Sequence, residues 1–292
     1  MGSLGGGYSS VPHCSRFLCP VGSTQMDESG GRVLVIVNSK DYHRGLMELL
    51  WARCKWHLCA DGGANRLFDS LSTKEERLRF VPDRIVGDLD SLRADVQTFY
   101  EAQGCVCEQV FDQDRNDLDK TLMSAQHLGG EVVILGGFGG RFDQQMASIH
   151  SLYSNLSPAA TGIAADTATT TSSSYTATAA AVAAATVPLA PGPSGFRFDQ
   201  LSIVDVDNVT FLLASGRHTI TPVSGTEGPV CGLLPIGGPC VVSTAGLKWN
   251  MSAQTLAFGG LVSSSNVVVD PVVEVETSSP LVWTISLHLD LP

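Results

Sequence analysis

The chain has 292 residues, of which 43% are hydrophobic and 16% charged, which allows one large or two ordinary globular domains and excludes a wholly disordered protein. Lys and Arg number 18 against 29 Asp and Glu, the formal net charge is -11, and no run is rich in basic residues. We therefore expect no nucleic-acid partner and no anionic membrane partner. An acidic protein can still bind a nucleotide if its carboxylates hold a divalent cation.

The eight cysteines contain no C-x-x-C pair and fit no zinc-binding spacing. In a chain of this length we expect reduced, mostly buried thiols in a cytoplasmic protein. The first thirty residues contain neither the apolar core of a secretory signal nor a myristoylation motif. The best candidate for a membrane span, residues 177–187, is too short and too rich in Ala and Thr to cross a bilayer.

Hydrophobic patterning first predicts a flexible tail and then an α/β domain. Residues 1–31 are rich in Gly and Ser and have no apolar periodicity, which is typical of a flexible tail. Over residues 32–157, apolar runs of strand length alternate with segments of helical period. This alternation predicts a parallel, doubly wound α/β sheet. The expected strands are 33–37, 57–60, 84–86, 105–111 and 131–135, and the expected helices are 41–53, one that opens at Gly62 or Gly63, 92–103, 116–128 and 142–155.

The second half of the chain has a different pattern. Residues 158–195 consist almost entirely of Ala, Thr, Ser, Pro and Gly, with Asp166 as the only charge, and are interpreted as a low-complexity surface insertion. Residues 196–292 contain short β-branched runs punctuated by Gly, Pro and Asn, which predict an all-β sandwich domain.

Acidic residues and glycines follow four of the expected strands. Ligands of a doubly wound sheet bind beyond the carboxyl ends of its strands, so a site is expected where these segments meet. Glycines there would let backbone N–H groups approach phosphates, although one glycine run alone is an ordinary turn, and no Walker A or G-x-G-x-x-G pattern is present. The four segments are Asp61-Gly62-Gly63-Ala64-Asn65, Gly87-Asp88-Leu89-Asp90-Ser91, Asp112 to Asp117, and Gly136 to Asp143.

Asp88 and Asp90 indicate a cation. Carboxylates at i and i+2 in extended chain point to the same side and repel unless a cation lies between them, and hard oxygen ligands suit Mg²⁺. An isolated D-x-D is more simply a solvated acidic turn, and Asp117 and Lys120 could equally pair on a helix surface. The coincidence of four such segments at consecutive strand ends favours a site for a nucleotide and Mg²⁺.

In their order and spacing these motifs resemble the eukaryotic thiamine pyrophosphokinases. The resemblance covers roughly 32–157 and 196–292, and it includes Gly139-Gly140-Arg141-Phe142-Asp143-Gln144 and, far downstream, Thr244-Ala245-Gly246-Leu247-Lys248-Trp249-Asn250. It implies a Mg²⁺-dependent transferase that moves the β,γ-pyrophosphoryl group of ATP to the hydroxyl of thiamine and yields thiamine diphosphate and AMP. It also implies a homodimer in which the C-terminal sandwich binds thiamine at the subunit junction.

The resemblance also assigns roles to single positions. It makes Asp88, Asp90, Asp117 and Asp143 the metal and catalytic acids, with Mg²⁺ on the first three. The nucleotide or phosphate contacts would be Asp61, Gly62, Gly63, Asn65, Lys120, Arg141 and Gln144, and the thiamine side would be Gln113, Thr244, Trp249 and Asn250. An aromatic side chain suits the cationic thiazolium, although Trp249 could also be an ordinary core residue. Either Asp117 or Asp143 could accept the proton of the hydroxyl.

Two departures from the family pattern are visible. Asn116 stands where the family usually has Thr, and since both residue types cap helices we expect little loss. The family lacks the insertion at 158–195, which we expect to loop out. Two other functions remain open at this point: a metal-dependent phosphohydrolase that uses the same acids to activate water, and a thiamine or nucleotide binding protein in which the insertion blocks turnover.

Overall fold

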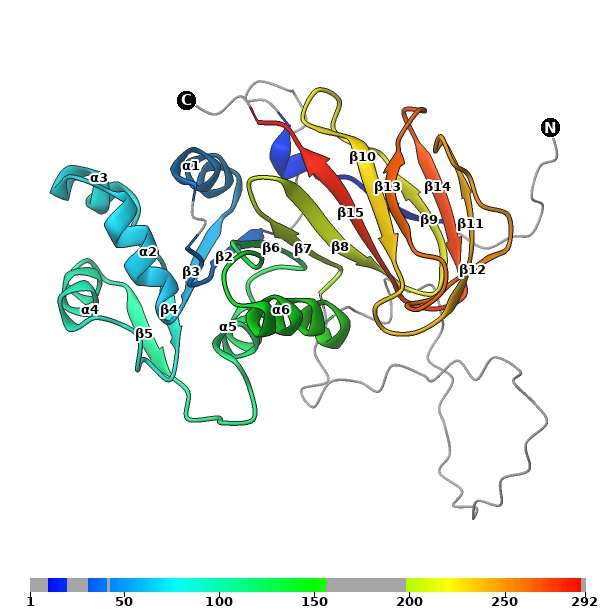
Figure 1. The fold of residues 1–292 in the computed structure, drawn as a ribbon. Helices are drawn as coiled ribbons and strands as arrows, with labels where there is room; N and C mark the ends of the chain where they lie inside the picture. The colour runs from blue at the N-terminus through cyan, green and yellow to red at the C-terminus, as the bar shows by residue number, and fades with distance from the viewer. Residues whose placement is uncertain (1–9, 20–30, 41–42, 156–197, 290–292) are drawn as a thin grey trace, which may run out of the picture.

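The computed structural model describes residues 10–19, 31–40, 43–155 and 198–289 (Figure 1). The predicted insertion at 158–195 lies outside these residues. None of the helices in the described ranges combines the length and the apolar character that a membrane crossing requires.

The first half of the chain builds the parallel part of a ten-stranded sheet. Its strand order is β5-β4-β3-β2-β6-β7, and all neighbouring pairs in this part are parallel. The chain runs outward from β2 to β5 and then returns to β6 beside β2, so the order reverses between β2 and β6. The strands are β2 (Arg32–Ile36), β3 (Trp56–Ala60), β4 (Arg84–Gly87), β5 (Val106–Gln109), β6 (Glu131–Leu135) and β7 (Gln200–Val204).

Helices cover both faces of this parallel part, because its strands are apolar on both sides. In β2, Leu34 and Ile36 pack in the cluster that contains α1, α2 and α4 side chains, whereas Val33 and Val35 pack in the cluster that contains α5 and α6 side chains. The predicted doubly wound α/β architecture is confirmed. The helices are α1 (Arg44–Arg53), α2 (Gly63–Ser70), α3 (Lys74–Arg79), α4 (Ala94–Glu101), α5 (Asp117–Ala125) and α6 (Phe142–Asn155).

The C-terminal part is the predicted sandwich, but one of its layers is the antiparallel end of the same large sheet. This end has the order β13-β10-β15-β8, and β8 pairs with β7, so the sheet runs without a break from one half to the other. It comprises β8 (Asn208–Leu213), β10 (Glu227–Leu234), β13 (Ser263–Val267) and β15 (Leu281–Leu287). The sequence pattern placed β7 in the sandwich half; in the structure it completes the parallel sheet, because α6 returns the chain beside β6.

The second layer of the sandwich is a five-stranded sheet of order β1-β9-β14-β11-β12 (Figure 1). Trp283 and Ile285 of β15 pack with Val242 and Val275 of this sheet, while Val282 of β15 packs on the helical side. This alternation is what a strand with two buried faces requires. The strands are β1 (Val11–His13), β9 (Gly216–Ile220), β11 (Cys240–Ala245), β12 (Gln254–Leu256) and β14 (Val273–Thr277).

The structure differs from the expected flexible tail within residues 10–19. Strand β1 pairs in parallel with β9, and the 3₁₀ turn η1 (Arg16–Leu18) buries Phe17 and Leu18 completely or nearly so. These two side chains join the core cluster that also contains α1. The segment is too short to show periodicity in the sequence, and its order comes from apolar contacts with elements that are distant along the chain.

Candidate active site

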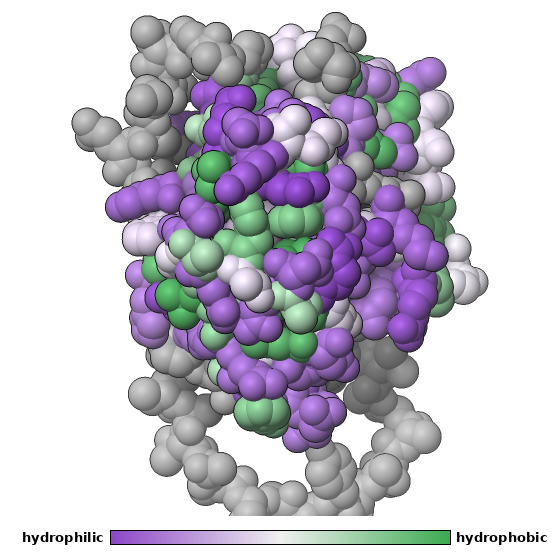
Figure 2. Space-filling view, turned by 90° about the vertical axis from the view of Figure 1, so that its left-hand side faces the viewer, coloured by the Kyte–Doolittle hydropathy of each residue, from purple (hydrophilic) through white to green (hydrophobic). Residues whose placement is uncertain are grey.

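A cleft of about 480 Å³ opens at the carboxyl ends of β2, β3, β4 and β6, where the strand order reverses. This is the position at which doubly wound sheets bind ligands. The molecular face on the side of α3, α4 and β5 is mainly hydrophilic, with smaller apolar areas (Figure 2). The cleft lining includes Asn38, Ser39, Lys40, Asp61, Gly62, Arg66, Asp88, Ser91, Arg115, Asn116, Asp117, Lys120, Gly136, Gly137, Gly139, Gly140, Arg141 and Gln144.

Glycines allow the backbone to approach closely at this edge. A Cβ atom on Gly63 would lie 2.2 Å from the carbonyl oxygen of Ile36, so only glycine lets α2 begin beside β2. Gly136 has a φ of 85°, and a Cβ atom there would lie 2.8 Å from the Cβ of Ser39. The ends of β2, β3 and β6 can therefore converge around one cleft.

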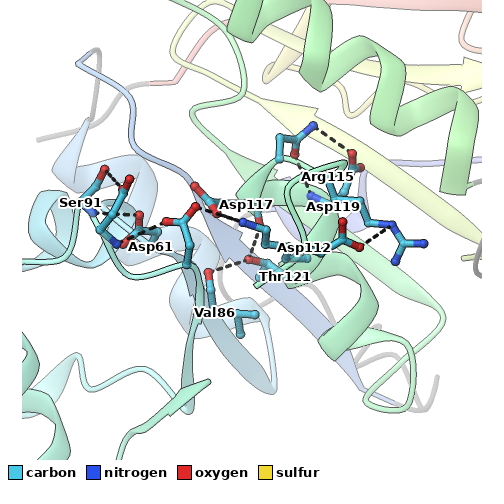
Figure 3. Close-up of polar contacts among 12 residues, drawn as sticks. Asp61, Val86, Ser91, Asp112, Arg115, Asp117, Asp119 and Thr121 are labelled. Atoms are coloured by element: carbon cyan, nitrogen blue, oxygen red, sulfur yellow. Dashed lines mark hydrogen bonds and ion pairs between the residues drawn. The ribbon is translucent and has the colours of Figure 1, made fainter. Parts of the chain in front are cut away.

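Three carboxylates meet in the cleft: two directly follow β3 and β4, and the third is at the start of α5. One oxygen each from Asp61, Asp88 and Asp117 lies within 4.8 Å of the others. Lys120, whose side chain is almost fully buried, places its Nζ 3.0 Å from Oδ1 of Asp117 and 3.3 Å from Oδ2 of Asp88. The close-up in Figure 3 shows Asp61 and Asp117 on facing sides of this group. The predicted partnership of Asp117 and Lys120 lies inside the site.

Asp61 is the most buried of the three acids, with 1% of its surface exposed. Its backbone is left-handed, with a φ of 41°, a conformation that is uncommon for residues other than glycine and concentrates at functional sites. The Ser91 N–H donates to its Oδ2 at 3.2 Å, whereas its Oδ1 is buried and has no hydrogen-bond partner among the described residues. Burial, reinforced by repulsion from the neighbouring carboxylates, raises the pKa of Asp61 to about 6. This oxygen is suited to a cation.

The neighbouring Asp88 and Lys120 are held in their charged forms. Burial alone would raise the pKa of Asp88, but hydrogen bonds from the Asp90 N–H and from Lys120 outweigh burial, and the pKa of Asp88 falls below its ordinary value. Burial alone would lower the pKa of Lys120, but the two carboxylates that accept its hydrogen bonds raise it. The site therefore keeps a buried ammonium beside carboxylates.

Asn116 caps the helix that carries Asp117 and Lys120. Its Oδ1 accepts from the Asp119 N–H at 2.8 Å, and its Nδ2 donates to Oδ2 of Asp119 at 2.9 Å. The expectation that Asn can cap here is confirmed. Ser151 of α6 donates to Oδ1 of Asp119 at 2.6 Å, so the same acid joins α5 to α6.

The segment from Gly136 to Gln144 forms the other side of the cleft. Four of its glycines line the cleft, together with Arg141 and Gln144. Asp143 is absent from the lining and forms an exposed ion pair with Arg141, which lowers the pKa of Asp143. Asp90 is likewise outside the group of three carboxylates, and its Oδ1 accepts from the Ser91 hydroxyl at 2.9 Å.

The residues expected on the thiamine side lie elsewhere in this chain. Gln113 is exposed in the segment between β5 and α5. Thr244 donates through its hydroxyl to Oδ1 of Asn250 at 3.3 Å, and Trp249 is 55% exposed, with the Lys248 ammonium 4.6 Å from the ring centroid. None of Gln113, Thr244, Trp249 and Asn250 lines the cleft.

Comparison with known proteins decides the family. A family model described as thiamin pyrophosphokinase, catalytic domain, matches residues 47–163, and one described as thiamin pyrophosphokinase, vitamin B1 binding domain, matches residues 217–282. Thiamine pyrophosphokinase 1 of Arabidopsis thaliana is 33% identical over 94% of this chain and 92% of its own length. The chain belongs to the thiamine pyrophosphokinase family. Thiamine pyrophosphokinase 1 of Oryza sativa subsp. japonica is 31% identical over 96% of this chain and 98% of its own length.

Solved structures share the fold. The crystal structure of yeast thiamin pyrophosphokinase matches with a TM-score of 0.72 and 24% identity and covers 96% of this chain and 92% of its own. Thiamin pyrophosphokinase from Candida albicans matches with a TM-score of 0.65 and 24% identity, covering 88% of this chain and 90% of its own. The predicted α/β sheet followed by a β-sandwich is thus the fold of these proteins.

Membership of this family confirms the predicted function. The family consists of transferases that move a pyrophosphoryl group from ATP to thiamine, and this chain is an enzyme of that class with ATP as its co-substrate. The phosphohydrolase and the non-enzymatic binding protein, which the sequence alone left open, are not favoured by any of the matches.

Several cleft residues were not assigned a role from the sequence. They are polar or positively charged, and a signal for some of them existed, because Asn38, Ser39 and Lys40 follow β2 just as the recognised acids follow β3 and β4. The rule that ligands bind beyond strand ends applies to β2 as well. The full set is Asn38, Ser39, Lys40, Arg66, Ser91 and Arg115.

Proposed function

We propose that Asp61, Asp88 and Asp117 hold the Mg²⁺ that accompanies ATP in the cleft. The observation that carries this proposal is the buried Oδ1 of Asp61, which has no hydrogen-bond donor in the described part of the chain and lies in a group of carboxylates that converge within 4.8 Å. Buried carboxylate oxygens of this kind are satisfied by a cation, and oxygen ligands are those that Mg²⁺ prefers. In this arrangement Asp90 serves the site through its N–H, which donates to Asp88 at 3.3 Å.

The glycine-rich side of the cleft is proposed to hold the phosphates. Gly136, Gly137, Gly139 and Gly140 line the cleft directly before α6, and N–H groups at a helix start favour anionic oxygens. Lys120 adds a positive charge from the facing side. When bound, Mg²⁺ neutralises charge on the phosphate oxygens, so the protein contributes mainly positioning and complementary charge, as in phosphoryl transfer generally.

The reaction needs one group that accepts a proton. The thiamine hydroxyl oxygen attacks the β-phosphorus of ATP, the bond from that phosphorus to the oxygen bridging to the α-phosphate breaks, and AMP leaves. A carboxylate near the hydroxyl takes its proton. We assign this role to the carboxylate oxygen of Asp117 that does not bind Mg²⁺, because Asp117 lines the cleft, whereas Asp143 lies outside the lining and is paired with Arg141.

The thiamine side is proposed to come from a second copy of the chain. The region matched by the vitamin B1 binding model, 217–282, includes Thr244, Trp249 and Asn250, yet these residues do not line the cleft of their own chain. The exposed Trp249 ring suits a cationic, flat substrate. A homodimer in which this region faces the partner's cleft would complete the site.

A cytoplasmic location is also proposed. All eight cysteines are free, and those at 54, 59, 105, 231 and 240 are buried. Unpaired thiols of this kind fit a reducing compartment.

The decisive test measures AMP formation by the purified chain with ATP and Mg²⁺, with and without thiamine, and identifies the thiamine product by mass. We expect thiamine diphosphate and AMP in equal amounts, and AMP only when thiamine is present. Asp88→Asn should abolish turnover, whereas Glu75→Gln, an equivalent change at an exposed position of α3, should not.

The variants at Asp117 and Asp143 test the assignment of the proton acceptor. Asp117→Asn should lower kcat far more than Asp143→Asn does, and the loss should persist at saturating Mg²⁺, where a variant that lost only a metal contact would recover. Equal losses, or a larger loss at Asp143, would contradict the assignment. Full turnover of Asp88→Asn would contradict the metal site itself.

A further inference from the structure

Three polar side chains at one-turn intervals lie along α2 and its start. Asn65 and Asp69 are four residues apart in α2 and fall on one face of the helix, and Asp61 precedes the helix by two residues. That face is turned toward the chain that follows β4, because all three side chains are bound to residues of that segment. We call residues 88–93 the β4–α4 turn; it carries Asp88 and Asp90.

Each of the three side chains contacts a different point of the β4–α4 turn. Asp61 accepts from the Ser91 N–H at 3.2 Å (Figure 3). Asn65 uses both ends of its amide: Nδ2 donates to the Ser91 carbonyl at 2.7 Å, and Oδ1 accepts from the Arg93 N–H at 3.1 Å. Asp69 accepts two hydrogen bonds from the Arg93 guanidinium, at 2.7 and 2.8 Å.

These contacts restrain a turn whose conformation needs support. Leu89, between the two acids, has a φ of 65°, which is an uncommon conformation for a side chain of this size. The turn places the Asp90 N–H where it donates to Asp88, and this hydrogen bond helps to orient the Asp88 carboxylate. Asn65 itself does not line the cleft, and both ends of its amide are engaged by the β4–α4 turn.

We propose that Asn65 and Asp69 are positioning residues for the Mg²⁺ site: they hold the β4–α4 turn so that Asp88 faces Asp61 and Asp117. This inference rests on the proposed metal site. The family resemblance assigned Asn65 to a nucleotide contact; we place it instead on the backbone of the turn that carries the metal ligand Asp88. Groups that orient metal ligands without touching the metal typically change metal affinity by roughly 10–100-fold when they are removed.

The experiment measures Mg²⁺ binding directly, by calorimetric titration of the full chain without nucleotide. Asn65→Ala and Asp69→Asn should each weaken Mg²⁺ binding by about tenfold. Asp69→Glu, which keeps a carboxylate for Arg93, should restore most of it. Gln97→Ala, which removes an exposed hydrogen bond to Glu101 within α4, is the matched control and should bind Mg²⁺ as the parent chain does.

Two further readouts separate positioning from a general loss of structure. The Asp69 and Arg93 side chains are 52% and 42% exposed, and exposed ion pairs contribute only about 0–1 kcal/mol, so Asp69→Asn should leave the unfolding midpoint nearly unchanged. In the enzyme assay, kcat of both variants should recover at saturating Mg²⁺, and the KM for thiamine should stay the same.

Three results would overturn the inference. Unchanged Mg²⁺ affinity in both variants, with normal binding by the parent chain, would refute the positioning role alone. A raised KM for ATP at saturating Mg²⁺ in Asn65→Ala would indicate that Asn65 contacts the nucleotide instead. A parent chain that binds no Mg²⁺ would refute the metal site and the inference together.

Discussion

The ammonium nitrogen of Lys120 lies 3.0 Å from Oδ1 of Asp117, one turn earlier in α5. Such pairs are usually exposed and contribute little, but here only 2% of the lysine side chain is exposed. A buried ammonium needs compensating negative charge, which the carboxylates of the cleft provide. Through its second contact, 3.3 Å from Oδ2 of Asp88, Lys120 also links the start of α5 to the residue that follows β4, and it provides a fixed positive charge beside the proposed metal site.

Replacing Lys120 by an uncharged residue tests whether its positive charge contributes to catalysis. Lys120→Met keeps most of the apolar length of the side chain but removes the cation proposed to face the phosphates, and loss of one such group typically lowers kcat by about a hundredfold or more. The measurement is AMP release at saturating ATP, thiamine and Mg²⁺. Lys74→Met, at an exposed position of α3, is the control and should keep full activity. Near-normal turnover of Lys120→Met would exclude a catalytic role for its charge.

Replacing Asp61 should stabilise the metal-free fold and remove the stabilisation that Mg²⁺ provides. Its pKa is raised above the ordinary value, so the metal-free fold is penalised when the carboxyl ionises as the pH rises through about 6. At pH 7.5 without Mg²⁺, Asp61→Asn should therefore raise the free energy of unfolding, by on the order of 1–3 kcal/mol. Adding Mg²⁺ should stabilise the parent chain and not the variant. A variant that is less stable without metal, or equally stabilised by Mg²⁺, would contradict this account.

Gly63 should be intolerant of any side chain. A Cβ atom there would lie 2.2 Å from a backbone oxygen of β2, so Gly63→Ala must displace α2 and should lower stability by about 1–3 kcal/mol. Because α2 holds the β4–α4 turn, Mg²⁺ binding should weaken as well. Gly260→Ala is the control: its nearest neighbour would be 3.5 Å away, and denaturant unfolding should change by less than about 0.5 kcal/mol.

Local periodicity predicted most regular elements of the α/β half. The helix expected at 142–155 is α6 with the same bounds, because its apolar positions recur at helical spacing. The short polar helix α3 was missed, although Thr73 and Glu76 form a capping box that the T-x-x-E pattern could have indicated. In the sandwich half, strand β10 contains Gly228, Pro229 and Gly232, and its sequence resembles a turn more than a strand. Pairing with β13 and β15 makes it a strand, and such pairing is not encoded locally.

The site residues could likewise be predicted where the signal is local in the sequence, and not where it depends on tertiary contacts. The rule of strand ends predicted that the acids after β3, β4 and β5 would meet, and Asp61, Asp88 and Asp117 do meet. Which of them share a ligand depends on distances between side chains from different strands. The D-x-D spacing favoured Asp90 over Asp61 as a metal ligand. The sequence carries no information on the left-handed backbone that directs Asp61 into the group.

A pair of buried histidines anchors the N-terminal strand β1. His13 lies 2.9 Å from His218 through ring nitrogens, and it stacks on Phe211. The other ring nitrogen of His218, Nε2, lies 2.8 Å from the Ala214 carbonyl and must donate to it. His218 therefore accepts through Nδ1, and His13 donates. The His218 ring must stay neutral for this chain of hydrogen bonds to persist, because protonation of its Nδ1 would remove the acceptor.

Acid should therefore weaken the attachment of β1. Burial and repulsion by His218 lower the pKa of His13 from 6.5 to about 3, and burial also lowers the pKa of His218. Below about pH 6.5 the unfolded chain binds protons that the folded chain excludes, so the free energy of unfolding falls as the pH drops, by up to about 1.4 kcal/mol per pH unit for each histidine. Urea unfolding of the parent chain and of His13→Phe between pH 7.5 and 5 measures this. His13→Phe leaves a nitrogen of His218 unpaired, so the variant should be less stable at pH 7.5. Its free energy of unfolding should fall less steeply as the pH drops. Equal slopes for the parent chain and the variant would contradict the role of His13.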